Sequence, residues 1–198
     1  TLFRSGAGAV LNRLKPTAGS SLVVFGCGTV GMSAIMAAHL CPCKNIIAVG
    51  GNEESLVLAK ELGATHTINR KKCDCIVSEI KKITEGGADY AIDTSGVPDF
   101  VKKALACVKF LGTAVVLGVT GELTIQVQEE LMGEGKSLIG IVEGDSNPKL
   151  FIPQLISYYK QGKFPFDKLI RVFEFDEINE AFEASHSGKA IKALLKMR

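Results

Sequence analysis

The regular alternation of short apolar runs with helical patterns constrains the fold of this chain more than any other feature. Runs rich in β-branched residues, such as "SLVVFG" (21–26) and "NIIAVG" (45–50), are separated by segments whose apolar residues recur with helical spacing. Strands that alternate with helices in this way predict β-α-β units and a parallel sheet. Near-continuous apolar strands fit a sheet that is covered on both faces. We therefore expect an α/β fold, a doubly wound parallel sheet of about six strands.

The other predicted elements follow the same rhythm. Further strands are predicted at "HTIN" (66–69), "ADYAIDTSG" (88–96) and "GTAVVLGV" (112–119), and "LTIQV" (123–127) and "SLIGIV" (137–142) could complete the sheet. Helices are predicted at "VGMSAIMAAHL" (30–40), "EESLVLAKELGA" (53–64), "DCIVSEIKKIT" (74–84) and "VPDFVKKALACV" (97–108).

The rhythm changes after about residue 143, where "GDSNP" (144–148) forms a turn-rich break. A helix is predicted at 149–164, and a second at 176–189 opens with Asp176 as its N-cap. Alternating runs at 171–175 and 190–197 predict two strands that cannot build much core of their own. We therefore divide the chain into a domain over 1–143 and a C-terminal segment over 144–198.

Composition excludes several classes of protein. The chain is 46% hydrophobic and 22% charged, as expected of a globular protein, and its net charge of +2 forms no basic stripe that would favour nucleic acid. No apolar run reaches the roughly 20 residues of a membrane-spanning helix. The first residues do not resemble a signal peptide, and without an initial Met we expect the chain to be processed or cut from something longer. Its six cysteines are expected to be reduced thiols of a cytoplasmic protein.

Two C-x-C pairs invite a metal hypothesis, Cys41 with Cys43 and Cys73 with Cys75. Structural zinc sites use wider ligand spacing, so thiols in loops and at helix ends are the alternative interpretation, and the roles of the four residues stay open. The three histidines, at 39, 66 and 186, show no ligand pattern. We therefore predict no metal site in this chain.

A glycine-rich loop joins the strand at 21–26 to the following helix. It reads Gly26-Cys27-Gly28-Thr29-Val30-Gly31, a G-x-G-x-x-G pattern between a strand and a helix, which is typical of dinucleotide-binding sites. Gly26 permits the tight turn, Gly28 allows a pyrophosphate to approach the backbone, and Gly31 lets the helix pack on the strand. Backbone N–H groups at the helix N-terminus then face the anion.

The acid expected about twenty residues later, which would bond the ribose hydroxyls, is absent. The second strand ends at Gly50, and Glu53 and Glu54 better suit the first turn of a helix. A glycine removes repulsion against a 2′-phosphate, and Asn52 could donate to it. The basic run at 70–72 could approach the adenosine side, although a solvated loop is the simpler interpretation. The sequence therefore permits NAD or NADP.

Several stretches resemble the C-terminal half of the zinc-dependent medium-chain alcohol dehydrogenases, in particular the aryl- or benzyl-alcohol branch. They include "SGAGAVLNRLKPTAGSSLVVFGCGTVGMSAIMAAHL", "GGADYAIDTSG" and "GKFPFDKLI", and together they cover nearly the whole chain in the family's order. The resemblance implies a Rossmann domain that carries NAD or NADP. The cofactor-binding residues that the loop and the resemblance imply are Gly26, Gly28, Thr29, Val30, Gly31, Gly50, Asn52, Thr94, Leu117, Gly118, Val119 and Lys192.

The family also has a GroES-like catalytic domain that carries zinc, and we expect that domain to be missing here. The position of a family zinc ligand is Thr1, which is no thiolate, so we predict no catalytic residue, although Ser5 could face the nicotinamide. The resemblance implies that the segment 144–198 returns to the missing domain. We expect the strands at 171–175 and 190–197 to lose their partners in that domain, leaving exposed apolar surface or an unpaired edge, and the region 123–142 to support a homodimer or higher oligomer.

The function implied is hydride transfer between an alcohol, including aromatic ones, and a nicotinamide cofactor, assisted by zinc in the full-length enzyme. This chain alone is expected to bind cofactor without catalysis. Two alternatives stay open: a non-catalytic nucleotide-binding module, and a zinc-independent reductase similar to quinone reductases. The cofactor and a small alcohol or aldehyde are the expected partners, with no nucleic acid and no membrane.

Overall fold

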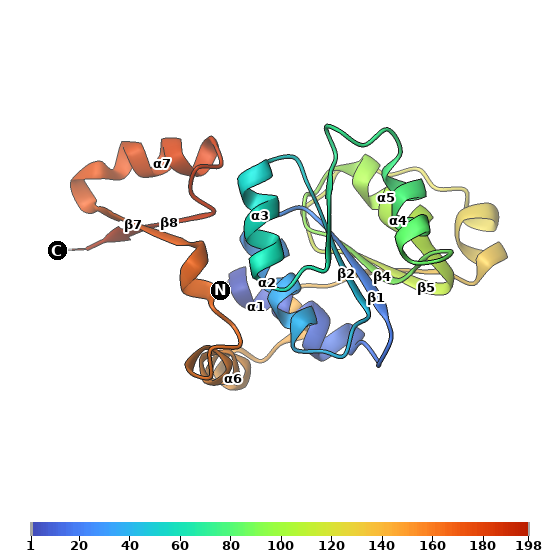
Figure 1. Cartoon of the computed structure of the whole chain (residues 1–198), viewed down its shortest axis with the longest axis horizontal. Helices are drawn as coiled ribbons and strands as arrows, with labels where there is room; N and C mark the ends of the chain where they lie inside the picture. The colour runs from blue at the N-terminus through green and yellow to red at the C-terminus, as the bar shows by residue number, and fades with distance from the viewer. Residues whose placement is uncertain (1, 198) are drawn as a thin grey trace.

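One parallel sheet of six strands forms the centre of the molecule (Figure 1). The computed structural model describes residues 2–197, so Thr1 lies outside the described residues. The strands stand in the order β3-β2-β1-β4-β5-β6. They are β1 (Ser21–Phe25), β2 (Asn45–Gly50), β3 (His66–Asn69), β4 (Ala88–Asp93), β5 (Val108–Val116) and β6 (Ser137–Gly140).

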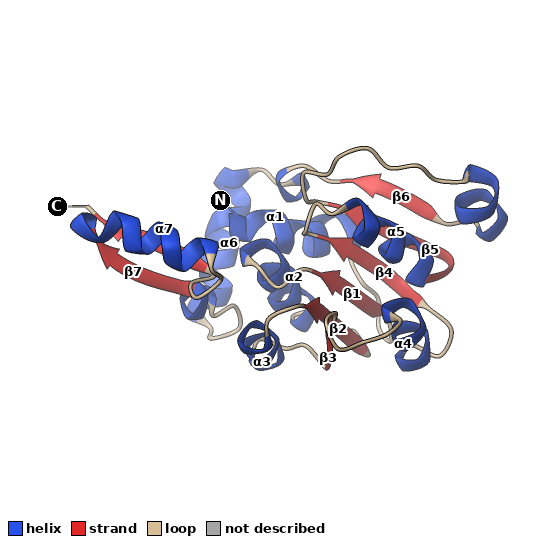
Figure 2. Cartoon of the chain, turned by 90° about the horizontal axis from the view of Figure 1, so that it is seen from above, coloured by secondary structure: helices blue, strands red, loops and turns tan. Residues whose placement is uncertain are grey.

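The strand order reverses between β1 and β4. The chain runs outward from β1 through β2 to β3, returns to the other side of β1, and continues outward through β5 to β6 (Figure 2). Val23 of β1 accordingly pairs with Ile47 on one side and with Ala91 on the other. The predicted doubly wound sheet of six strands is therefore confirmed, and it has the order typical of dinucleotide-binding domains.

Helices cover both faces of the sheet, because each strand presents apolar side chains to both sides. Leu22 and Val24 of β1 pack into one buried cluster with α2, whereas Val23 and Phe25 pack into the other with α4 and α5. The helix α2 is buried between the sheet and α1, which is the position expected of a helix with apolar residues on nearly all sides. The helices of this domain are α1 (Leu2–Gly8), α2 (Thr29–His39), α3 (Glu53–Glu61), α4 (Ile76–Ile83) and α5 (Pro98–Cys107).

Short helical turns complete this part of the chain. The helix α1 continues into a wider π-helical turn at Ala9–Leu14, which the sequence did not predict. The other turns are Val127–Leu131, Met132–Glu134 and Glu143–Asp145. Among residues 2–197, no helix has both the length and the apolar character needed to cross a membrane.

The C-terminal segment forms a small β-α-β unit that projects from the large sheet (Figure 2). Strands β7 and β8 pair with each other in parallel, and within residues 2–197 each keeps one edge without a neighbouring strand, which is the unpaired edge that was expected. Its own core is small, centred on Phe173, Ala181, Ala184 and Ala190. The elements are α6 (Pro148–Lys160), β7 (Ile170–Glu174), α7 (Ile178–His186) and β8 (Lys192–Lys196), with short turns at Phe166–Leu169 and Phe175–Glu177.

Apolar side chains remain exposed on this unit, as expected. Val172 is 60% exposed and Phe182 is 70% exposed, and a two-stranded sheet leaves one edge of each strand without a neighbour. The segment nevertheless contacts the main body through α6, because Phe151, Leu155 and Phe164 belong to the same buried cluster as α2.

Two local predictions were wrong. The run 123–127 forms no strand, because it is a loop that enters the turn Val127–Leu131, and β6 is the strand that pairs with β5. Asp176 is not the N-cap of α7, since it lies inside the turn Phe175–Glu177 that precedes the helix. That turn is capped instead by Glu174 and Glu177 in a reciprocal capping box.

Candidate functional site

The carboxyl ends of neighbouring parallel strands bring most of the predicted site residues to one edge of the sheet. The glycine loop follows β1, residues 50–52 end or follow β2, Thr94 follows β4, and residues 117–119 follow β5. The reversal of strand order between β1 and β4 lies at the centre of this group. Open α/β sheets place their ligand sites at such a reversal, outside the carboxyl ends of the strands.

The glycine loop is closely packed at Gly26 and Gly31 and has open space at Gly28. Gly26 has a φ of +102°, a left-handed conformation that glycine adopts without strain. A Cβ on Gly31 would overlap the carbonyl oxygen of Gly26, so the close packing of α2 on the loop requires a glycine there. A Cβ on Gly28 would meet no atom within 4 Å. Gly28 therefore leaves open space at the start of α2.

The first turn of α2 faces this open space. The carbonyl of Gly28 accepts the first helical hydrogen bond, from Met32 N at 2.8 Å, so the N–H groups of Thr29, Val30 and Gly31 have no intrahelical acceptor. The first turn of this helix carries no acidic residue. Backbone N–H groups and the helix dipole together favour an anion at this position.

Thr94 ties the end of β4 to the glycine loop. Its Oγ1 donates to the carbonyl of Phe25 at 2.9 Å and approaches that of Gly26 at 3.4 Å. The preceding residue, Asp93, has a fully buried side chain. Its carboxylate accepts bonds from Ser95 Oγ at 2.6 Å, Ser95 N at 3.2 Å and Gly96 N at 3.0 Å. This buried carboxylate fixes the turn after β4, and sequence reasoning did not single it out.

The turn after β2 lies directly beside the glycine loop. A Cβ on Gly50 would lie 2.8 Å from Cys27 Sγ and 3.1 Å from Leu56 Cδ2, so the thiol of the loop fills the space of a side chain at position 50. Burial raises the pKa of the Cys27 thiol to about 12. Asn52 caps α3, because its Oδ1 accepts a bond from Ser55 N at 3.2 Å.

The turn after β5 is hydrogen-bonded to Asp93, at the buried end of β4. The N–H groups of Leu117 and Gly118 both donate to the carbonyl of Asp93, at 2.9 and 3.2 Å. Val119 is completely exposed at the rim. The next residue, Thr120, has a buried hydroxyl that finds no hydrogen-bond partner in the described structure. A buried hydroxyl without a partner is a group that a bound polar ligand can satisfy.

Lys192, in the C-terminal unit, lies near the start of α2. It begins β8, directly after Ile191, whose carbonyl accepts a 2.9 Å bond from Thr29 Oγ1 of the glycine loop. The Lys192 side chain is half-buried, and no carboxylate lies within 4.0 Å of its ammonium in residues 2–197. The Thr29 bond therefore brings a basic residue from the far end of the chain to the start of α2.

The cysteine pairs lie far from one another in the fold. Cys41 and Cys43 precede β2, at the amino edge of the sheet, whereas Cys73 and Cys75 follow β3, at the carboxyl edge. All six cysteines are free thiols, and nowhere in residues 2–197 do three His, Cys, Asp or Glu side chains gather as metal ligands.

Ser5 lies in α1, next to Gly6, whose Cβ would overlap the carbonyl of Val30 in the first turn of α2.

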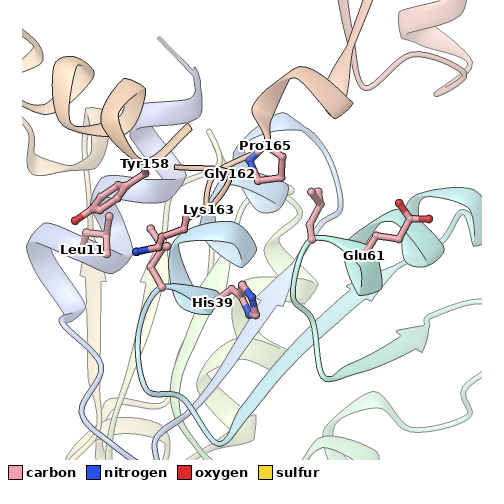
Figure 3. Close-up of a pocket in the computed structure, with 9 residues that line it drawn as sticks. Leu11, His39, Glu61, Tyr158, Gly162, Lys163 and Pro165 are labelled. Carbon is pink, nitrogen blue, oxygen red and sulfur yellow. The ribbon is translucent and has the colours of Figure 1, made fainter. Parts of the chain in front are cut away.

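A separate groove of about 530 Å³ lies between α2, α3 and the loop after α6 (Figure 3). His39, Glu61, Tyr158 and Lys163 contribute its polar groups. His39 is the last residue of α2, a helix of 11 residues. Because such a helix is about 16 Å long, the groove is well separated from the glycine loop. It is not part of the candidate site.

Sequence reasoning missed two residues at the site edge and left the place of a third open. Asp93 has a local signal, since Asp followed by Ser and Gly is typical of a side-chain-capped turn. Thr120 has none, because only the fold shows that its hydroxyl is buried. Arg70, for which an approach to the adenosine side and a solvated loop were both open, is exposed in the turn after β3, and its guanidinium lies against Gly51, where a Cβ would come within 2.8 Å of its Nε.

Known proteins with the same architecture are numerous. The profile of the family described as zinc-binding dehydrogenase matches residues 29–157. A geraniol dehydrogenase from Castellaniella defragrans is 37% identical over 195 residues, which are 98% of this chain and 52% of that protein. The chain therefore spans about half the length of this curated relative.

Solved structures agree over nearly the whole chain. A benzyl alcohol dehydrogenase from Acinetobacter calcoaceticus superposes with a TM-score of 0.94 at 43% identity, over 99% of this chain and 54% of that one. An alcohol dehydrogenase zinc-binding domain protein from Burkholderia ambifaria gives a TM-score of 0.95 at 42% identity, over 99% of this chain and 53% of that one.

Proposed function

The chain belongs to the zinc-binding dehydrogenase family, and on this premise we propose that it holds a nicotinamide dinucleotide for hydride transfer to or from an alcohol. One observation carries the proposal. The carboxyl ends of β1, β2, β4 and β5 converge on the open first turn of α2, at the reversal of strand order. This is the arrangement by which α/β sheets bind dinucleotides.

The residues present fit such a cofactor. The open space at Gly28 and the free N–H groups of the first turn of α2 suit a pyrophosphate, and Lys192 supplies a positive charge beside it. The turn at Gly50 and Asn52 suits the adenosine ribose. The buried hydroxyl of Thr120, next to Leu117, Gly118 and Val119, gives the nicotinamide side a polar partner.

When bound, the dinucleotide supplies the hydride chemistry, and this chain's residues hold and orient it. Thr94 and Asp93 keep the loops after β1, β4 and β5 in fixed positions, so that both ends of an extended cofactor are held at once. Geraniol and benzyl alcohol, after which two relatives are named, are both primary alcohols next to an unsaturated carbon. We propose a substrate of this class, aromatic alcohols included.

The zinc of the family name does not fit this chain. Its described residues gather no three metal ligands, so no step through zinc is derived from them. We propose that the zinc ligands and most of the substrate pocket belong to the half of the relatives' length that this chain does not span. Residues 144–198 would then complete that domain in part, and the region 123–142 would join subunits.

Binding is testable directly, because the chain contains no Trp and the fluorescence of the reduced nicotinamide can be followed without interference. We expect NADH or NADPH fluorescence to rise on titration with the chain. The variant Gly28→Asp should abolish the rise by placing a carboxylate where the pyrophosphate lies. Gly140→Asp is the matched control, since it is also an open glycine, on β6. Unchanged binding by Gly28→Asp would contradict the proposal.

The chain alone is expected to bind cofactor without oxidising alcohols. The assay is the formation of NADH or NADPH from benzyl alcohol, with and without added zinc. Alcohol-dependent formation would show that these 198 residues carry a complete catalytic site. Reduction of a quinone by the chain would instead favour the zinc-independent alternative.

A further inference from the structure

We infer that the dinucleotide carries a 2′-phosphate on its adenosine ribose, and that Arg70 binds this phosphate; the inference rests on the proposed function. An unphosphorylated ribose is bonded by a carboxylate at the end of the second strand, whereas a 2′-phosphate needs a nearby Arg and no free carboxylate. In this chain the second strand ends at Gly50.

The glycine at position 50 is built into the packing of the site. Cys27 Sγ and Leu56 Cδ2 lie 2.8 and 3.1 Å from the position of a Cβ there, so these two side chains occupy the space that an Asp would need. The packing of the glycine loop and α3 against the end of β2 therefore leaves no space for an acidic side chain at position 50.

Two acids follow Asn52 at the start of α3, and neither takes the place of the missing carboxylate at position 50. The carboxylate of Glu53 binds Asn69 Nδ2 at 2.6 Å and Lys72 Nζ at 2.6 Å, and the hydrogen bond from Lys72 holds its pKa below the usual range. Glu54 lines a groove that faces β7 and the loop before β8. The charge of Glu53 is therefore paired with that of Lys72, and Glu54 stands on the side of α3 that faces the C-terminal unit.

The guanidinium of Arg70 is placed over the turn that ends β2. Its main-chain N–H donates to the carbonyl of Gly50 at 2.8 Å, and its Nε lies 2.8 Å from the position of a Cβ on Gly51. Its Cζ lies 5.6 Å from the ring centre of Phe100, which in turn packs against Phe25. The ring thus supports the guanidinium at the edge of the site.

No carboxylate within residues 2–197 lies within 4.0 Å of this guanidinium, so its donors are available to a ligand. Arginine presents a planar set of donors that matches the oxygens of a phosphate. Asn52 adds a second donor, because its Oδ1 is used in capping α3 and its Nδ2 makes no hydrogen bond in the described structure. The turn therefore offers a cation, an amide and no opposing charge.

The competing role for Arg70 is stacking on the adenine of an unphosphorylated cofactor. Stacking would stabilise NADH and NADPH equally, whereas a phosphate contact would stabilise NADPH alone. The comparison of the two cofactors therefore separates the two roles.

The test is a fluorescence titration of the chain, of Arg70→Gln and of Lys71→Gln with NADPH and with NADH. We expect the unmodified chain to bind NADPH at least about tenfold more tightly than NADH, as one charge-assisted hydrogen-bonded contact would give. Arg70→Gln should lose about tenfold in NADPH affinity and change NADH affinity less than about threefold. Lys71→Gln, which removes a neighbouring exposed charge, should leave both affinities unchanged.

Any one of four results would overturn the inference. Tighter binding of NADH by the unmodified chain would do so and leave the proposed function intact. An equal loss of both affinities in Arg70→Gln would assign the residue to adenine stacking. Binding of neither cofactor would overturn the proposed function together with the inference. Adenosine 2′,5′-bisphosphate should compete with NADPH better than adenosine 5′-monophosphate, and equal competition would also count against the phosphate contact.

Discussion

Thr29 Oγ1 donates a 2.9 Å hydrogen bond to the carbonyl of Ile191 across 162 residues of sequence. The donor stands in the first turn of α2, and the acceptor directly precedes Lys192 in β8. The bond therefore couples the open first turn of α2 to the C-terminal unit, and it fixes the backbone next to the basic residue of that unit.

The first prediction concerns this bond. Thr29→Val keeps the shape of the side chain but removes the donor, which should cost about 1 kcal/mol of local stability. We expect faster amide hydrogen exchange in residues 190–196 and weaker binding of the dinucleotide, because Lys192 is less well placed. Thr113→Val on β5, whose side chain makes no hydrogen bond in the described structure, is the control. Unchanged exchange in β8 would show that the unit is held by packing alone.

The second prediction concerns Cys27 and Gly50. Gly50→Asp should destabilise the chain by about 1–3 kcal/mol, because its Cβ would press on Cys27 Sγ and Leu56. Adding Cys27→Ala should recover part of this loss, giving a favourable coupling in a double-mutant cycle measured by urea unfolding. The double variant should also bind NADH more tightly than the parent chain. Strictly additive losses would mean that the two positions do not share one space.

The third prediction concerns the buried carboxylate of Asp93. Asp93→Ala would leave the donors of Ser95 and Gly96 without a partner and create a cavity, which should cost about 2–5 kcal/mol. Asp99→Ala is the matched control, since that exposed residue makes only a surface ion pair with Lys103 in the first turn of α5 and should cost less than about 1 kcal/mol. Urea unfolding of both variants is the measurement. Similar stabilities would show that the turn after β4 does not depend on the carboxylate.

The sequence was sufficient to predict the sheet and most of the site edge, because both depend on local patterns. Apolar runs that alternate with helices specify parallel pairing, and a loop that follows such a strand must lie at the carboxyl edge. Gly26, Gly28 and Gly31 could therefore be placed from their spacing alone.

The remaining features depend on contacts between distant segments, which spacing does not encode. The run 123–127 has the composition of a strand but no neighbour to pair with. The pairing of β7 with β8 is a second contact of this kind, since the sequence predicted both strands and an unpaired edge but not that the two strands pair with each other. The position of Arg70 against Gly51 depends on the pairing of β2 with β3, so a solvated loop was the simplest interpretation of the sequence.

The last prediction concerns the order in which the cysteines react. A hydrogen bond from Ser78 Oγ to the exposed Cys75 Sγ, at 3.1 Å, holds the pKa of that thiol below its usual value. Burial raises the pKa of Cys27 and of Cys107 to about 12, and that of Cys43 to about 11.

Because the thiolate is the nucleophile, a lower pKa gives a larger reactive fraction at neutral pH, and alkylation of Cys75 should level off at a lower pH than that of Cys27, Cys43 and Cys107. Iodoacetamide labelling from pH 6 to 9, followed by peptide mass spectrometry, should therefore modify Cys75 first and Cys27 and Cys107 last. Ser78→Ala should shift the pH profile of Cys75 upward, because its thiolate loses a donor, while the profile of Cys43 stays in place. If Cys43 reacted before Cys75 at pH 7, exposure and hydrogen bonding at the start of α4 would not control the reactivity of these thiols.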